Sequence, residues 1–276
     1  MTRARDLAKG TFSGDLTVDT NTLVVDSANN RVGVGTVLPD GALHVHTGTA
    51  GTVSASVQAD ELVLEGSAET GMTIISPDNQ SARIRFTSPS TNTDVGGASI
   101  FYRQNINKMS IGTEVAGGRL AIKSGAGTEA ITIDSAGRVT MPYQPSFYVT
   151  SNSSVTLTGN LNFNVNIHNV GNHFSGGVFT APIAGLYQFN FYGFSGANGA
   201  TPTPSGSYTV ATLLKNGNSV MSTYVQFFST TYYAPMGFSG AILLSANDSV
   251  GIHILGYVYS DSANPKYLGF SGYLVG

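Results

Sequence analysis

The sequence predicts an all-β protein, with an extended β shaft followed by a C-terminal head. Three observations support this prediction. Apolar residues alternate with polar ones or form short blocks bounded by Gly, Asn, Asp and Ser, a pattern typical of strands and turns. Glycine accounts for 34 of the 276 residues, above the usual share of roughly 7%. Charged residues make up only 11%, less than half the usual share of about 25%.

Charge is distributed unevenly along the chain, which predicts a domain boundary near Pro142. Residues 1–141 hold 11 of the 13 basic and 14 of the 16 acidic side chains. The remainder holds only Lys215, Lys266, Asp248 and Asp261. We therefore expect a docking peg at 1–10, a proximal shaft at 11–66, a β-rich shaft module at 67–141 and a head at 142–276.

An internal repeat supports the shaft. Residues Leu23–Thr36 are echoed by Ile131–Thr140, and each segment predicts a strand, a tight turn and a second strand that begins with Arg-Val. Lys108–Thr113 and Arg119–Lys123 repeat the short-strand rhythm. Isolated hairpins bury too little surface to be stable. We therefore expect three chains to wrap together and share a core.

The segment Asn30–Thr36, with Pro39 and Leu43–Val45, resembles the "NRVGIGT…P…LHV" units of bacteriophage fibre shafts. Gly71–Thr113 is also similar to β modules of such fibres. A generic β-solenoid or hairpin stack is the alternative. The resemblance implies a non-enzymatic virion protein whose N-terminus, with Arg3, Arg5 and Leu7, docks on other virion proteins.

The C-terminal half shows the clearest alternation. Leu161–Ile167 alternates apolar residues with Asn, and Leu186–Tyr192 places Tyr187, Phe189 and Phe191 on one face. Turn signals recur at the spacing of about 8–12 residues that is typical of a sandwich or jelly roll. Further strands are expected at 208–215, 218–228, 236–244, 249–257 and 268–275.

Four motifs in order, Gly177–Phe189, Leu213–Gly217, Leu243–Val250 and Phe270–Leu274, resemble the heads of the complement-component-1q/tumour-necrosis-factor superfamily. The resemblance implies a jelly-roll head and a homotrimer. Calcium-binding members of that superfamily use clustered acidic residues, which this half lacks. We therefore expect no cofactor.

Loop lengths predict where the head binds. Short turns at Asn216–Gly217 and Ser245–Asp248 lie at one end, and long loops at 195–207, 229–235 and 258–267 lie at the other, distal to the shaft. Tyr with Ser, Gly and Asn is typical of adaptable binding loops, although these Tyr side chains could instead pack between loops or subunits. The residues predicted to contact a receptor are Tyr232, Tyr233, Tyr257, Tyr259, Asp261, Lys266 and Tyr267.

Enzymatic chemistry is not expected. The head has almost no acids and so lacks the paired carboxylates of glycoside hydrolysis. The net charge of -3 offers no basic field for nucleic acid. The sequence contains no run of 18 apolar residues, so we expect no membrane-spanning helix. The first ten residues also lack the apolar stretch of a secretory signal, which counts against a secreted bacterial adhesin.

His44 and His46 form the one metal-like pattern. Residues two apart on a strand share a face, so three chains around an axis would offer six imidazoles to a transition metal. This arrangement resembles the iron sites of some phage fibre tips. The alternative is a packing role for both rings.

The favoured function is a homotrimeric phage tail fibre on the virion exterior, with a head that binds a host surface glycan or protein. The alternative is a trimeric capsid decoration or head-fibre protein.

Overall fold

The computed structural model describes residues 14–52, 54–87, 97–152, 155–156, 158–196, 206–227, 233–260 and 265–276. These residues form strands, turns and two 3-10 helices of three residues each, so the all-β prediction is confirmed. Neither helix in this described part has the length and apolarity needed to cross a membrane. The predicted docking residues Arg3, Arg5 and Leu7, and the loop residues Tyr232 and Asp261, lie outside the described residues.

The chain divides into two compact units. One comprises Met1–Phe86 and Ser99–Ile111, and the other comprises Thr87–Ala98 and Gly112–Gly276.

The first unit begins with a five-stranded sheet in the order β1-β2-β3-β4-β5. β2 and β3 pair antiparallel, as the repeat predicts, and β1 adds antiparallel to β2, but the last two strands add in parallel. Local alternation did not predict this parallel pairing, which aligns Gly33 with His44 and His44 with Val63. The strands are β1 (Leu16–Val18), β2 (Leu23–Asp26), β3 (Arg31–Val34), β4 (Leu43–His46) and β5 (Leu62–Glu65).

In both copies of the sequence repeat, an aspartate side chain accepts hydrogen bonds from the turn that follows it. Asp26 accepts hydrogen bonds from the Ala28 and Asn29 backbone N–H groups and from Asn29 Nδ2, at 3.1, 3.0 and 2.7 Å. Asp134 likewise accepts from the Ala136 and Arg138 backbone N–H groups and from Arg138 Nε, at 2.9, 3.0 and 2.7 Å. These hydrogen bonds lower the pKa of both carboxyls.

Two three-stranded sheets follow, in the orders β6-β7-β8 and β11-β10-β9. The strands predicted at Lys108–Thr113 and Arg119–Lys123 are confirmed in position, the second one residue later. The strands are β6 (Ser81–Phe86), β7 (Ala98–Arg103), β8 (Lys108–Thr113), β9 (Leu120–Ser124), β10 (Thr128–Ile133) and β11 (Val139–Thr140), with helix η2 (Gln104–Ile106) between β7 and β8.

A single copy of the chain hardly buries the apolar residues of these sheets. Among the buried hydrophobic residues of the described ranges, Val24 alone precedes Phe147. Leu38, Val57 and Ile75 are 79%, 88% and 88% exposed. The segment before Pro142 therefore has almost no hydrophobic core within one copy.

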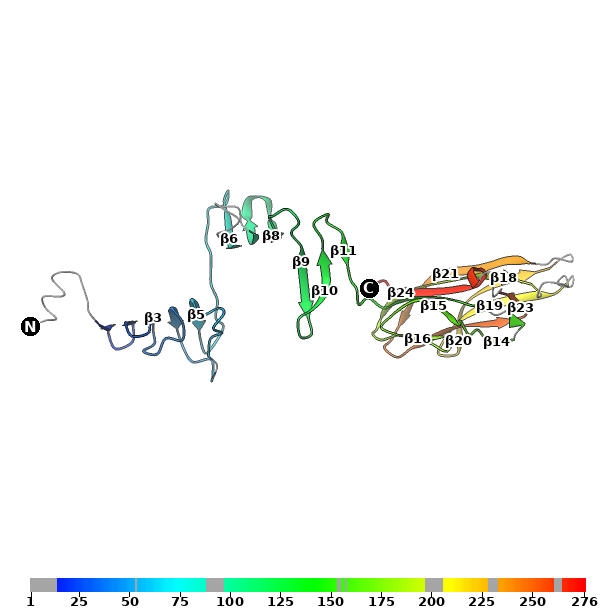
Figure 1. Ribbon diagram of the computed structural model, residues 1–276, viewed down its shortest axis with the longest axis horizontal. Helices are drawn as coiled ribbons and strands as arrows, with labels where there is room; N and C mark the ends of the chain where they lie inside the picture. The colour runs from blue at the N-terminus through cyan, green and yellow to red at the C-terminus, as the bar shows by residue number, and fades with distance from the viewer. Residues whose placement is uncertain are drawn as a thin grey trace, which may run out of the picture. The chain divides into compact units, whose positions relative to one another are not determined.

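The C-terminal residues form two facing sheets (Figure 1). One has the order β13-β23-β18-β24-β12-β15, with β21 on the other edge of β18. The second has the order β16-β17-β22-β19-β20, with β14 beside β22. From β17 to β24, strands alternate between the sheets except at β19-β20 and β23, which is a jelly roll.

The strands of the jelly roll are β12 (Ser146–Thr150), β13 (Val155–Thr156), β14 (Gly159–Asn160), β15 (Val165–Val170), β16 (Phe174–Ser175), β17 (Val178–Thr180), β18 (Gly185–Ser195), β19 (Tyr208–Lys215), β20 (Asn218–Gln226), β21 (Ala234–Leu244), β22 (Ser249–Leu255), β23 (Tyr257–Tyr259) and β24 (Gly269–Leu274), with helix η3 (Pro265–Tyr267) before β24.

The core between the sheets is rich in phenylalanine. Tyr187, Phe189 and Phe191 on β18 are all buried on one face, as predicted. Phe147 stacks on Phe179, with ring centroids 5.1 Å apart, and meets Phe270 edge to face at 5.1 Å. Such ring pairs add about 0.5–1.5 kcal/mol beyond their burial.

The segment Leu161–Ile167 differs from a simple strand. Leu161 and Phe163 are buried, but β15 begins only at Val165, and Ile167 is exposed. The Leu161 N–H donates to the Ile252 carbonyl at 2.8 Å. The alternation in this segment therefore indicates which side chains enter the core, but it does not indicate one continuous hydrogen-bonded strand.

Candidate functional site

Several strand ends meet at one end of the jelly roll. Ser195 at the end of β18 pairs with both Ala234 and Val258, and Tyr208 pairs with Gln226. The connections 196–207, 227–233 and 260–268 all leave from this end, which we call the loop end. The predicted grouping of the long connections is therefore confirmed by the strand register.

The opposite end is closed by short turns. Asp248 accepts a hydrogen bond from Asn216 Nδ2 at 2.6 Å and from the Ser245 N–H at 2.8 Å, and it pairs with Lys215 Nζ at 3.0 Å. These contacts, the Asn216 bond first, lower the pKa of Asp248 to about 2. The chain enters here, since the Leu274 N–H donates to the Pro145 carbonyl.

Four rings lie together at the loop end, and we call them the aromatic group: Phe194, Tyr233, Tyr259 and Tyr267. Ring centroids are 4.4 Å apart for Tyr233 and Tyr259, 5.8 Å for Tyr259 and Tyr267, and 5.7 Å for Phe194 and Tyr267. Tyr267 is 37% exposed, and the side chain of its neighbour Lys266 is also exposed. The predicted residues Tyr233, Tyr259, Lys266 and Tyr267 thus come together.

A hydrogen bond between two buried hydroxyl groups joins the strands that carry this group. Ser195 Oγ donates to Thr209 Oγ1 at 2.7 Å, and both side chains are fully buried. Thr209 Oγ1 also donates to the Tyr257 carbonyl at 3.2 Å and accepts from the Tyr257 N–H at 3.1 Å. These bonds hold β23 against β18 and β19, so the strands that carry the rings are fixed relative to one another.

Two details differ from the sequence prediction. Tyr257 and Tyr259 lie on the short strand β23 rather than on a loop, and Tyr257 makes none of the described ring contacts. Tyr208 begins β19, where a strand at 208–215 was predicted, and it stacks on Tyr224 at 5.7 Å. Phe194 was not predicted as a site residue because it lies on a strand, among the outward-facing residues of β18.

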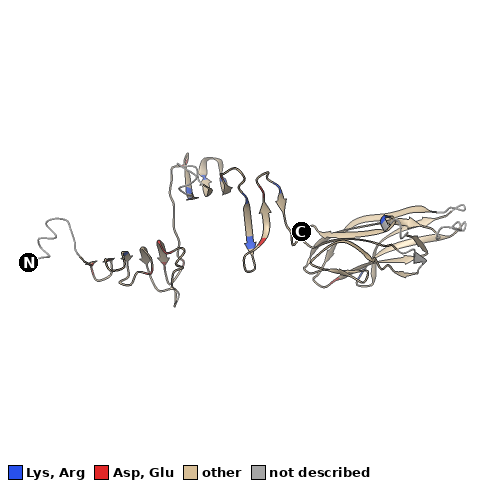
Figure 2. Ribbon diagram, in the orientation of Figure 1, with Lys and Arg blue, Asp and Glu red and all other residues tan. Residues whose placement is uncertain are grey.

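The jelly roll carries few charges, and Figure 2 shows its strands almost entirely free of charged residues. Its described charged side chains are Lys215, Asp248 and Lys266, of which the first two pair at the short-turn end. Lys266 is thus the one charged side chain that the described residues place at the loop end.

Residues 146–275 match the C1q domain family. This segment is a C1q-like jelly-roll domain. C1q domains are trimeric, non-enzymatic modules that often bind receptors. The globular domain of the zebrafish complement 1qA protein is a similar solved structure, with 20% identity, coverage of 48% of this chain and 98% of that one, and a TM-score of 0.38. No curated protein matches the chain.

The histidines of the predicted metal site lie in the first unit, away from the C1q domain in sequence. His44 is 2% exposed, and its Nδ1 accepts a hydrogen bond from the Asp40 N–H at 3.2 Å. Its Nε2 lies 3.2 Å from Glu65 Oε2 but is not aligned as a hydrogen bond. His46 Nε2 lies 3.9 Å from the same oxygen.

Since Nδ1 accepts a hydrogen bond, a neutral His44 ring carries its proton on Nε2, which faces Glu65. His44 thereby links the turn at Asp40 to β5 within one chain. Asp40, His44 and Glu65 are close enough together to be considered as metal ligands, but a metal at Nε2 would have to displace that proton. The metal on a trimer axis stays a prediction.

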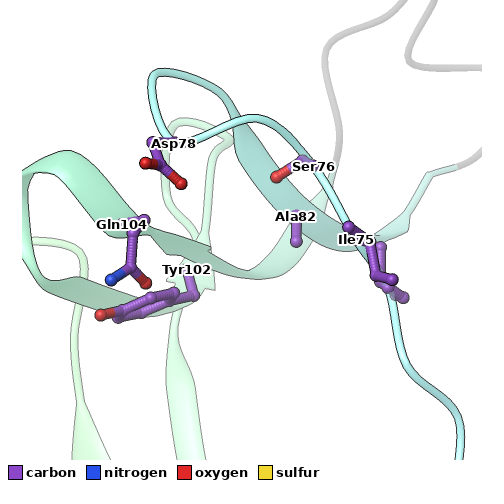
Figure 3. Close-up of a pocket in the computed structure, with 7 residues that line it drawn as sticks. Ile75, Ser76, Asp78, Ala82, Tyr102 and Gln104 are labelled. Carbon is purple, nitrogen blue, oxygen red and sulfur yellow. The ribbon is translucent and has the colours of Figure 1, made fainter.

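A hollow of about 230 Å³ lies in the first unit (Figure 3). Asp78 is the one carboxylate among its described lining residues, so the hollow offers no carboxylate pair. Its wall includes the highly exposed Ile75, which suits packing against another chain. The lining residues are Ile74, Ile75, Ser76, Asp78, Ala82, Tyr102 and Gln104.

Proposed function

We propose that this chain is the subunit of a homotrimeric bacteriophage tail fibre, and that its C1q domain contacts the host cell surface. The observation that carries this proposal is the aromatic group at the loop end, opposite the point where the chain enters the domain. A binding surface placed there lies at the end of the domain opposite the chain entry.

The exposed apolar residues before Pro142 support a trimeric shaft. One copy leaves Leu38, Val57 and Ile75 almost fully in water, and burying apolar surface yields roughly 25 cal/mol per Å². Two further copies provide the missing partner surface. The proposed shaft is extended, is built of hairpins and interwoven strands, and docks on the virion through residues 1–10.

The outer face of the sheet that contains β18 supports a trimeric head. This face is uncharged and carries Tyr148 and Tyr192, whose hydroxyl oxygens are 2.7 Å apart. Burial and the Tyr148 hydrogen bond raise the pKa of Tyr192. Beside them lies a shallow hollow of about 370 Å³ lined in part by His168 and Tyr273. An uncharged face with aromatic side chains suits packing against another copy.

The ligand of the loop end is a surface glycan. Tyr supplies a flat apolar face and a hydroxyl, so it stacks on a sugar ring and hydrogen-bonds at low entropic cost. The role is adhesive, and the protein acts without catalysis on the virion exterior.

Adsorption of fluorescent trimer to host cells tests this function. The double variant Tyr233→Ala/Tyr259→Ala is expected to lose most adsorption while light scattering still reports a trimer. Tyr143→Ala, an exposed Tyr at the chain entry, is the matched control. Unchanged adsorption of the double variant would remove the loop end as the receptor site.

A trimeric capsid decoration is the second candidate, because the same trimer with its loop end outward would also suit it. Gold labelling of the C1q domain on whole particles separates the two. Label on the tail supports the fibre, and label over the capsid supports decoration.

A further inference from the structure

We infer that the glycan bound at the loop end is anionic and that Lys266 contacts its carboxylate or phosphate groups. This inference rests on the proposed function and adds the chemical class of the ligand. It starts from the position of Lys266, which directly precedes the exposed ring of Tyr267 on helix η3. A sugar ring stacked on Tyr267 would bring its substituents within reach of the ammonium group.

Helix η3 is firmly anchored, so Lys266 and Tyr267 are presented from a fixed base. Leu268, which follows the helix, is fully buried, and its carbonyl accepts from the Ser151 N–H at 3.2 Å. Gly193 allows this close approach: a Cβ there would lie 2.8 Å from Leu268 Cδ1. A preorganised site loses little conformational entropy when a ligand binds.

The charge balance at the loop end favours an anion. Lys215 is compensated by Asp248 at the other end of the domain, at 3.0 Å. Lys266 has no such ion pair within the described part of the chain, and its side chain is exposed. Lys266 is the one charged side chain among the described residues of the loop end, and an exposed cation attracts anionic ligands.

The two contacts complement each other chemically. The Tyr267 ring, in edge contact with Phe194 and beside Tyr259, offers a face for stacking. The ammonium group donates charge-assisted hydrogen bonds, which are about twice as strong as neutral ones, to carboxylate or phosphate oxygens. Together they select acidic over neutral polysaccharides.

Binding of the full-length trimer to an array of purified bacterial surface polysaccharides tests this inference. The array holds neutral chains, uronic-acid chains and phosphate-bearing chains, so the last two distinguish the sources of negative charge. We expect the bound members to be acidic, and binding to weaken as sodium chloride rises, because salt screens exposed charges. Lys266→Gln should bind about tenfold more weakly, and Lys266→Arg should restore binding.

Lys215→Gln is the matched control, since it removes the same charge at the opposite end. Three outcomes overturn the inference: binding to neutral members alone, salt-independent binding, or wild-type binding by Lys266→Gln. If Tyr233→Ala/Tyr259→Ala abolishes binding while Lys266→Gln binds as the wild type does, the inference of an anionic ligand fails and the proposed function stands. If no member binds, or the Tyr variant binds normally, the proposed function itself fails.

Discussion

The ring of Tyr259 lies against that of Tyr233, with centroids 4.4 Å apart and planes tilted by 45°. The two residues come from β23 and from the segment before β21, and they meet because Ser195 pairs with both Ala234 and Val258. The contact therefore couples two connections at the loop end.

A double-mutant cycle measures that coupling. Tyr233→Ala and Tyr259→Ala should show an interaction energy of about 0.5–1.5 kcal/mol in urea unfolding, the usual value of an aromatic pair. Tyr233→Ala combined with Tyr143→Ala should be additive within about 0.5 kcal/mol. If the effects of Tyr233→Ala and Tyr259→Ala on the free energy of unfolding were additive, the contact between the two rings would not stabilise the fold.

Gly272 admits two core rings, so a methyl group there should be costly. A Cβ at Gly272 would lie 2.6 Å from Phe189 Cδ1 and 2.8 Å from Phe147 Cε1. Gly272→Ala is expected to lower the free energy of unfolding by about 1–3 kcal/mol, as overpacking does. Gly112→Ala, whose Cβ would meet nothing within 4 Å, should change it by less than about 0.5 kcal/mol.

Asp248 should make the C1q domain sensitive to acid. Its pKa falls from 3.8 to about 2 on folding, so its contribution is fully present above the unfolded value and is lost as the pH falls through about 2. The difference in free energy of unfolding between wild type and Asp248→Asn should be constant near neutral pH and shrink below about pH 4. Guanidinium titrations at several pH values measure it, and a difference independent of pH would contradict the assignment.

Ile75 tests the trimeric shaft. Ile75→Asp places a charge on a side chain that is 88% exposed in one copy. If copies pack there, the variant should dissociate or unfold at lower temperature in light scattering and calorimetry, because burying an unpaired charge is costly. Asn79→Asp, on a neighbouring exposed turn, adds the same charge and should leave the trimer intact. A stable Ile75→Asp trimer would place Ile75 outside any contact between copies.

Strands whose faces differ in polarity were predictable. Leu186–Tyr192 shows a period of two because one face of β18 meets the phenylalanine core, and the observed strand is Gly185–Ser195. The hairpin turns were also predictable, because Asp26 and Asp134 act on backbone groups within four residues of themselves.

Contacts between distant segments were not predictable in this way. Glu65 approaches His44 only because β4 and β5 pair in parallel in one particular register. Phe194 joins the aromatic group through a ring on η3. Neither contact leaves a periodic signal, since each depends on which strand ends become neighbours.

The sequence by itself determined the all-β class, the approximate strand positions of the C-terminal half and the grouping of its long connections, because hydrophobic alternation and turn chemistry act over a few residues. Only the tertiary structure decided which tyrosines touch, which nitrogen of His44 faces Glu65, and that Tyr267 contacts Phe194 while its ring stays partly exposed. Those features depend on strand register and side-chain packing, which are set by the core as a whole.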